Sequence, residues 1–154
     1  MKKIEDLLRH HPFVEGLGEE IVSLIAGCAK NVVYQENEYM FREGESSDFF
    51  YLIRHGTVAL EMFIPGKGPH SFLTAKNGEI VGSAWLIPPY RWTYDARAVE
   101  LTRAIAFECK CLRDKCEADN HAGYELMKRF IPPLLERLQM AQLQTADMYG
   151  EGKA

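Results

Sequence analysis

The segment GEIVGSAWLIPPYRWTYDARA, residues 78–98, has the residue types best suited to holding an anion. Gly78 and Gly82 bracket its opening, and Ser83 and Ala84 follow, so that backbone amides in a turn of small residues can approach a phosphate. The remainder is bulky, with two Trp, two Tyr and two Pro. We expect a nucleotide site, a site for another ligand, or an anion turn whose space the aromatic rings have filled.

A second group of reactive side chains is the run ECKCLRDKC, which contains Cys109, Cys111 and Cys116. It supplies only three thiolates, and its C-x-C-x4-C spacing matches none of the usual zinc or iron–sulfur patterns. Three of the five histidines, His55, His70 and His121, offer no spacing that completes a site with these cysteines. We therefore predict no metal site. We also expect these cysteines and Cys28 to be ordinary, half-buried, reduced thiols.

Length and charge restrict the class of protein. The 154 residues, 47% of them hydrophobic, suit one globular domain. The net charge of -4 argues against a broad nucleic-acid-binding face, which needs clustered Lys and Arg. The chain has no signal-peptide pattern and no membrane span of roughly 20 apolar residues, so we expect a cytoplasmic protein with no membrane partner. It also has no G-x-S-x-G elbow, P-loop or H-E-x-x-H motif, and we do not expect an enzyme.

The elements that must position these residues follow from hydrophobic periodicity. Residues 1–30 predict a short helix that stops before Pro12 and an amphipathic helix carrying Ile21, Leu24, Ile25 and Cys28. Residues 31–109 alternate with a period of two between glycine turns, which is typical of a β-sandwich or barrel with the segment 78–98 inside it. Residues 110–150 predict a short helix and a long one. The fold class is mainly β with flanking helices.

The long helix, expected from about His121 to Tyr149, has apolar residues spaced like the seam of a two-stranded coiled coil. The seam residues are Met127, Ile131, Leu134, Leu138, Ala141, Thr145 and Met148. We expect a homodimer through this seam, although the same stripe would suit a helix lying on its own barrel. Pro132 and Pro133 lie inside the seam, and we expect the helix to kink or restart there.

The string YQENEYMFREGESSDFFYLIRHGTVAL, residues 34–60, resembles the cyclic nucleotide-binding domain of the catabolite activator protein and Fnr family. Gly44 and Gly56 fall where that family turns between strands, and such turns need φ > 0, which glycine adopts most readily. Asn37 replaces a usual glycine, which is tolerable because Asn also enters the left-handed region. The resemblance implies a double-stranded β-helix, the cupin-like jelly roll, with N-terminal helices and a long C-terminal helix.

The resemblance also implies a ligand site in the segment 78–98, hereafter the cassette, but two contacts are altered. Ser83 stands where the family has a ribose-binding Glu, and Trp92 stands where it has the phosphate-binding Arg. Arg91 could replace that Arg if the loop is shifted by one residue. Gln142, beside Ala141, falls at the turn of the long helix that faces the base. The candidate ligand residues are Gly78, Glu79, Gly82, Ser83, Ala84, Trp85, Tyr90, Arg91, Trp92, Thr93 and Gln142.

Two functions remain open at this stage. The first is a stand-alone ligand-sensing regulatory module, with no fixed cofactor, in which a cyclic nucleotide or other small ligand moves the terminal helices; cyclic AMP is expected to bind weakly. The second is a ligandless structural or adaptor dimer in which Trp85, Tyr90 and Trp92 plug the pocket. Regulators of the family continue into a helix-turn-helix domain that this sequence lacks. Any output is therefore expected to pass through a protein partner or the dimer, not through DNA.

Overall fold

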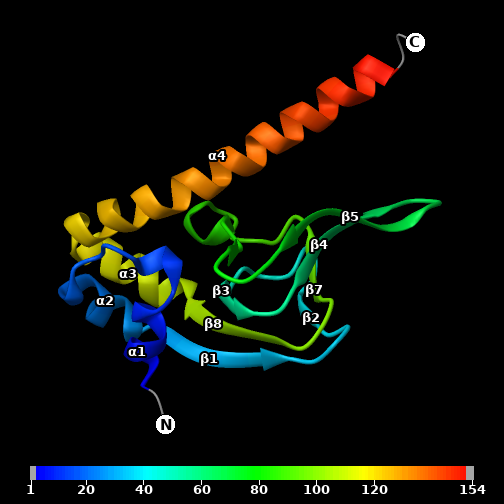
Figure 1. Ribbon diagram of the computed structural model, residues 1–154. Coiled ribbons are helices and arrows are strands. Elements are labelled where there is room, and N and C mark those ends of the chain that lie inside the picture. Colours follow the sequence, from blue (N-terminus) through cyan, green and yellow to red (C-terminus); the bar gives the residue numbers. More distant parts are fainter. Residues whose placement is uncertain (1–2, 152–154) are drawn as a thin grey trace.

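The computed structural model describes residues 3–151 and contains two facing antiparallel sheets with helices packed on one side of the roll (Figure 1). The first sheet has the order β1 (Ala29–Tyr34), β8 (Thr102–Glu108), β3 (Phe49–His55) and β6 (Ile80–Val81). The second has the order β2 (Tyr39–Phe41), β7 (Asp95–Ala98), β4 (Val58–Ile64) and β5 (Gly68–Ala75). This jelly roll confirms the predicted fold class.

The first sheet separates two hydrophobic cores. Because successive side chains of a strand point to opposite faces, Leu52 and Phe107 pack toward the helices, whereas Ile53 and Ala106 point into the roll. The face inside the roll carries several alanines from β7 and β8, among them Ala96 and Ala104. Small side chains on these strands leave room inside the roll for larger groups.

Two tight turns have the backbone that the sequence predicts. Gly44 has φ +88° and Gly56 has φ +116°, and Asn37 enters the left-handed region at φ +70°. At Gly56 a Cβ would also fall 2.8 Å from the carbonyl oxygen of Leu101, so both the angle and the space call for glycine.

The helices begin and end close to the boundaries predicted from the sequence. They are α1 (Ile4–Arg9), the 3-10 turn η1 (Pro12–Val14), α2 (Glu19–Ala26), α3 (Cys109–Ala118) and α4 (Asn120–Glu151). The first ends before Pro12, as predicted. The β region begins at Ala29, and α3 begins at Cys109, within two residues of the expected boundaries at 31 and 110.

The expected restart at Pro132 and Pro133 is wrong, because α4 continues through both prolines as one helix (Figure 1). Each proline removes one backbone donor, but the residues on either side are held by the rest of the protein. Phe130, only 3% exposed, packs against Trp85 with ring centroids 5.3 Å apart, and Leu134 lies against the roll. Tertiary packing on both sides of the pair therefore keeps the helix continuous.

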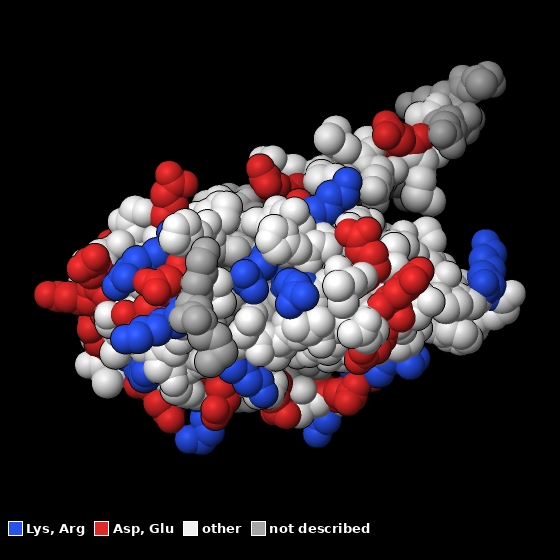
Figure 2. All heavy atoms as spheres, turned by 60° about the horizontal axis from the view of Figure 1, so that its bottom comes forward, with Lys and Arg blue, Asp and Glu red and all other residues white. Residues whose placement is uncertain are grey.

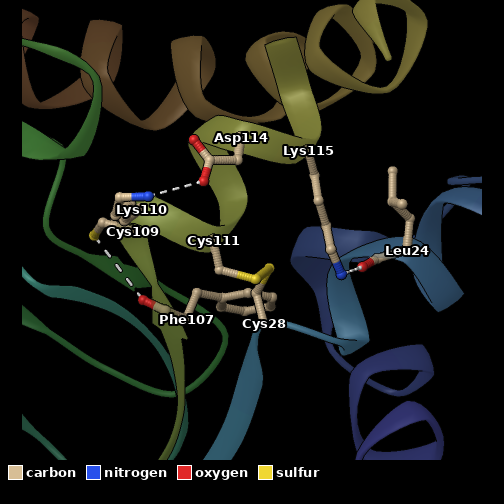
Figure 3. Close-up of a disulfide and its surroundings, with 8 residues drawn as sticks. All are labelled: Leu24, Cys28, Phe107, Cys109, Lys110, Cys111, Asp114 and Lys115. Atoms are coloured by element: carbon tan, nitrogen blue, oxygen red, sulfur yellow. Dashed lines mark hydrogen bonds and ion pairs between the residues drawn. A yellow bond between two sulfur atoms is a disulfide. The ribbon is translucent and has the colours of Figure 1, made fainter. Parts of the chain in front are cut away.

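The expectation that all four cysteines are free thiols is also wrong, since Cys28 and Cys111 form a disulfide (Figure 3). The bond joins the start of β1 to α3 across 83 residues of sequence, and Lys115 of α3 donates a hydrogen bond to the carbonyl of Leu24 beside it. Cys109 and Cys116 remain thiols. Burial raises the pKa of Cys109 to about 12 and raises that of Cys116, so both are poor nucleophiles.

The charged side chains are mixed rather than clustered on the face that Figure 2 presents, where Lys and Arg alternate with Asp and Glu. Such a face lacks the concentrated positive charge that attracts a phosphate backbone. Among the described residues, no helix has the length and apolar character needed to cross a bilayer.

Candidate functional site

The opening of the cassette forms the turn that the sequence predicts. Gly78 and Gly82 have φ +84° and +104°, and Ala84 begins the 3-10 turn η2 (Ala84–Leu86). A Cβ at Gly82 would fall 2.5 Å from the Trp92 ring, so that ring rests directly on the glycine. The Trp92 indole thus occupies the space against the Gly82 backbone that a phosphate would use.

Trp92 fills the part of the roll above this turn. Its ring stacks on Phe41 with centroids 3.5 Å apart and planes 7° apart, and its side chain is only 4% exposed. Both residues belong to the core cluster inside the roll. This face-to-face stack leaves the Trp92 face covered by protein rather than free for a ligand.

The other two rings of the predicted plug, those of Trp85 and Tyr90, lie elsewhere, so the three rings do not form one plug. Trp85 is 1% exposed and packs on the helical side of the first sheet, 5.5 Å from Phe50. Tyr90 lies under the guanidinium of Arg113, 4.0 Å from its ring centroid, and Arg113 also donates a 2.6 Å hydrogen bond to the carbonyl of Trp85. The second half of the cassette is therefore anchored to α3.

Arg91 faces away from the cavity between the roll and α4, which is described in the next paragraph. Its guanidinium donates a 2.9 Å hydrogen bond to the carbonyl of Gly44, and its backbone forms a bridge with Ser46. Arg91 and Thr93 are exposed and do not line the pocket described below. The geometry therefore does not support the replacement of the family's phosphate-binding Arg by Arg91.

A cavity of about 350 Å³ lies between the roll and α4, and we call it the roll pocket. This volume is within the range of small-molecule sites. Its walls come from β4, β5, the cassette, Tyr94 beside β7, and one face of α4. They consist of Leu60, Met62, Phe72, Leu73, Ser83, Tyr94, Leu134, Arg137, Met140, Ala141 and Gln144. A molecule bound there would touch the rigid roll and the long helix together.

Arg137 is the charged residue of this lining. It is half-buried and donates a short hydrogen bond to the carbonyl of Ile80. Burial raises the pKa of the neighbouring Tyr94 phenol, and the positive charge of Arg137 offsets part of that rise. Tyr94 therefore stays protonated near neutral pH and can donate a hydrogen bond beside the guanidinium.

Gly78 and Glu79 line a different hollow, which shares Leu73, Arg137 and Met140 with the roll pocket. This hollow has a volume of about 590 Å³ and lies between η1, the start of the cassette and the first half of α4, including Pro132 and Pro133. Of the predicted ligand residues, the roll pocket itself contains only Ser83. Gly78 and Glu79 therefore do not share a cavity with Ser83.

The expected role of Gln142 also needs correction. Gln142 is exposed and does not line the roll pocket, whereas Gln144 does.

The residues of the predicted dimer seam do not share one environment. Met127 packs against the helix-side core, and Leu134 and Ala141 face the roll pocket, whereas Ile131, Leu138, Thr145 and Met148 are exposed.

The exposed side of α4 carries a stripe with its own coiled-coil spacing, which we call the outer stripe. It consists of Ile131, Leu135, Leu138, Gln142, Thr145 and Tyr149, all exposed in the single chain. These residues follow one another in steps of four and three and so share one helix face. Figure 1 shows the C-terminal half of α4 extending past the roll.

Four residues that line the roll pocket are not among the site residues predicted from the sequence: Phe72, Tyr94, Arg137 and Met140. The signal for Arg137 was present, because it lies three residues after Leu134 and four before Ala141, on the same helix face. Choosing it required knowing which face of α4 lies on the roll. Phe72 and Tyr94 required the pairing of strands that are distant in sequence.

The comparisons with known proteins agree with this architecture. The model of the family "Cyclic nucleotide-binding domain" matches residues 31–119, more than half of the chain. A putative cyclic nucleotide-binding protein from Geobacter metallireducens is 27% identical with a TM-score of 0.76, and the match covers 87% of this chain and 97% of that one.

Two further structures share the fold. The catabolite activator protein of Thermus thermophilus is 22% identical with a TM-score of 0.70, with 90% of this chain and 63% of that chain covered. The sensor domain of the transcriptional regulator DNR from Pseudomonas aeruginosa is 18% identical with a TM-score of 0.69, with 88% and 91% covered. With the jelly roll, the glycine turns and the cassette in the expected order, the chain belongs to the cyclic nucleotide-binding domain family.

Proposed function

We propose that this protein is a ligand-sensing regulatory module in which a small molecule enters the roll pocket and shifts α4 relative to the roll. The observation that carries the proposal is the shared lining of that pocket. Leu60 and Phe72 belong to the roll, whereas Leu134 and Met140 belong to the helix. The similarity to the Geobacter protein, which is described as a putative cyclic nucleotide-binding protein, supports a ligand-binding role.

The mechanism is a population shift. A ligand that contacts both walls binds most tightly when α4 takes one particular position on the roll, and it shifts the helix only by its difference in affinity for the available positions. Since α4 continues past the roll, a small movement near Arg137 is carried to the exposed end of the helix. That end is the part of the molecule best placed to report binding to a partner.

Cyclic AMP is not expected to bind with the affinity usual for the family. An arginine–phosphate contact contributes about 1.5–3 kcal/mol, so that its loss weakens binding roughly 10- to 150-fold. Here Trp92 replaces that arginine and lies on Gly82, and Ser83 replaces the ribose-binding Glu. A different ligand, or a nucleotide held weakly, therefore fits the site better.

We further propose that α4 forms a homodimer through the outer stripe. In the single chain the side chains of Leu138 and Leu135 are 53% and 51% exposed, and pairing with a second copy would cover both. Gln142 would then lie at the centre of the seam, where a polar residue favours one register and orientation over others. This role replaces the contact with the base that the sequence suggested for it.

A second candidate function, a ligandless structural or adaptor dimer, is favoured by one observation. Trp92 already occupies the space above the cassette turn, as a plugged pocket requires. The two candidates differ in the remaining cavity: the sensor uses it, whereas the adaptor leaves it empty.

The two functions can be separated by blocking the cavity from the helix side. Ala141 is exposed and lines the roll pocket, so Ala141→Trp should fill the pocket without disturbing the buried core. Leu143→Trp, on α4 but outside the lining, is the matched control. Thermal unfolding with cyclic AMP, cyclic GMP and a set of small organic anions provides the readout, since a bound ligand stabilises the folded state.

A sensor predicts that at least one of these compounds raises the melting temperature of the unmodified protein and of Leu143→Trp, but not of Ala141→Trp. The adaptor predicts no stabilisation of any of the three proteins. Stabilisation that survives in Ala141→Trp would place the ligand outside the roll pocket and would contradict the proposed site.

A further inference from the structure

The roll pocket receives its positive charge from α4 and not from the cassette. Arg137 is the basic side chain of the lining, whereas the two cassette arginines are held elsewhere, Arg91 on the carbonyl of Gly44 and Arg97 on the carboxylate of Glu61. Within the described residues, no carboxylate lies within ion-pair distance of the Arg137 guanidinium. A half-buried guanidinium without an acidic partner is a strong attractor for an anion.

Arg137 can take such an anion without losing its present contact. The guanidinium has five N–H donors, and one of its nitrogens donates to the carbonyl of Ile80. The remaining donors suffice for a bidentate contact with a carboxylate. Tyr94 adds a hydroxyl near the same charge, and among the described residues no protein group accepts a hydrogen bond from it.

The rest of the lining suits an apolar body. Leu60, Met62, Leu134 and Met140 are aliphatic or thioether side chains, and Phe72 meets the Tyr94 ring edge-on at 5.6 Å. A sugar and a purine would bring several polar edges into this space, and only Ser83 and Gln144 are left to satisfy them. Polar groups left without partners against these apolar walls weaken binding. An aromatic ring with one anionic group satisfies both the walls and Arg137.

We propose that the roll pocket selects small aromatic carboxylates, with the carboxylate on Arg137 and the ring between Phe72 and Met140. This inference rests on the proposed sensing function, because it specifies the ligand class for the same pocket. The ligand's charge would be held by the moving element, α4, and its apolar body by the roll. Loss of the charge contact should therefore affect both affinity and the response of the helix.

The test uses 1-naphthoate and its neutral analogue 1-naphthamide, with binding measured by titration calorimetry. The proposal expects naphthoate to bind the unmodified protein at least about tenfold more tightly than naphthamide. Arg137→Gln should weaken naphthoate binding about 10- to 100-fold and leave naphthamide unchanged, because it removes the charge and keeps an amide donor. Arg137→Lys should restore part of the loss, since a single ammonium replaces a bidentate fork.

Arg129→Gln is the matched control, because Arg129 lies two turns earlier on α4 and also donates to a backbone carbonyl, that of Glu15, at 2.6 Å. It does not line the roll pocket, so its naphthoate affinity should match that of the unmodified protein. An equal effect of Arg137→Gln on both compounds, or none on either, would overturn the inference.

A cyclic AMP titration separates the two proposals. If cyclic AMP binds the unmodified protein and naphthoate does not, the sensing function stands and the carboxylate inference is overturned. If neither binds and no compound of the stabilisation screen does, both are overturned. Naphthoate binding that Ala141→Trp abolishes and Leu143→Trp retains supports both.

Discussion

Trp92 stands where related proteins carry the arginine that binds a cyclic phosphate, and the structure gives it a packing role instead. Its ring lies 3.5 Å from that of Phe41, and it covers Gly82. Trp92→Ala should therefore lower the free energy of unfolding by about 3–5 kcal/mol, as expected when a large buried ring is removed. Urea titration measures this loss.

Ile87→Ala, in the same loop, is the control for that substitution. The Ile87 side chain is 68% exposed, so its truncation should change stability far less. If the two variants lost equal stability, the Trp92 ring would not be part of the packed core. If Trp92→Ala lost stability but gained affinity for cyclic AMP, the ring would be shown to exclude the nucleotide.

His11 is a buried titratable residue, 5% exposed, that ties η1 to β3. Its Nδ1 accepts a hydrogen bond from the Phe13 amide, so Nε2 carries the proton and donates to the carbonyl of Ile53 at 2.9 Å. Burial lowers the pKa of His11 from its ordinary value of 6.5, with a smaller lowering from Arg54 that opposes the raising effect of the Ile53 bond. The folded protein therefore holds this imidazole neutral.

The sign of the pH effect follows from that lowered pKa. Below pH 6.5 the unfolded chain binds a proton that the folded chain does not, so stability is full above about pH 6.5 and falls as the pH decreases toward the folded value. Urea unfolding at pH 7.5 and 5.5 should show this loss for the unmodified protein and for His10→Gln. In His11→Gln the loss of stability that comes from protonation of His11 should disappear. An unchanged pH dependence in His11→Gln would exclude His11 as its source.

At the scale of the elements, α4 carries two apolar faces with different tasks. One lies on the roll and lines the pocket, and the outer stripe faces solvent. If the stripe forms the proposed seam, Leu138→Glu should convert a dimer into a monomer, because it places a charge at the centre of an apolar interface. Light scattering coupled to size exclusion at micromolar concentration measures the mass.

Leu143→Glu makes the same chemical change on the same helix, off the outer stripe. Leu143 is 65% exposed, and this variant should remain dimeric. A monomeric unmodified protein would contradict the seam directly. Dissociation by both variants alike would mean that net charge on the helix, and not the outer stripe, controls assembly.

The elements were predictable because their signals are local. The short apolar runs of β3 and β8, the stop before Pro12 and the left-handed turns at Gly44 and Gly56 depend on near neighbours. The site was less predictable, because the predicted dimer seam and the outer stripe of α4 both have apolar residues in steps of four and three. Only the packing of α4 on the roll decides that Arg137 points to the pocket and Gln142 to solvent.

At the scale of the whole molecule, the Cys28–Cys111 bond ties the start of the β-roll to the helices that follow it. Sequence spacing could not reveal the pair, since 83 residues separate the two cysteines and the fold alone brings them together. Such a bond forms under oxidising conditions, whereas the cytosol keeps most thiols reduced. Its contribution to stability in an oxidised sample can be measured directly.

Reduction should destabilise the folded protein, because the cross-link restricts the unfolded chain between Cys28 and Cys111. Disulfides typically contribute about 2–4 kcal/mol, and the long loop places this one near the upper end, so we expect the free energy of unfolding to fall by about 4 kcal/mol on adding dithiothreitol. Cys111→Ser should start at the lower stability and respond no further to the reductant, whereas Cys116→Ser, which keeps the bond, should respond like the unmodified protein. Titration of the oxidised, urea-unfolded protein should detect two thiols, those of Cys109 and Cys116. A titre of four thiols, or an equal response of Cys111→Ser and the unmodified protein to dithiothreitol, would mean that the bond does not form in solution.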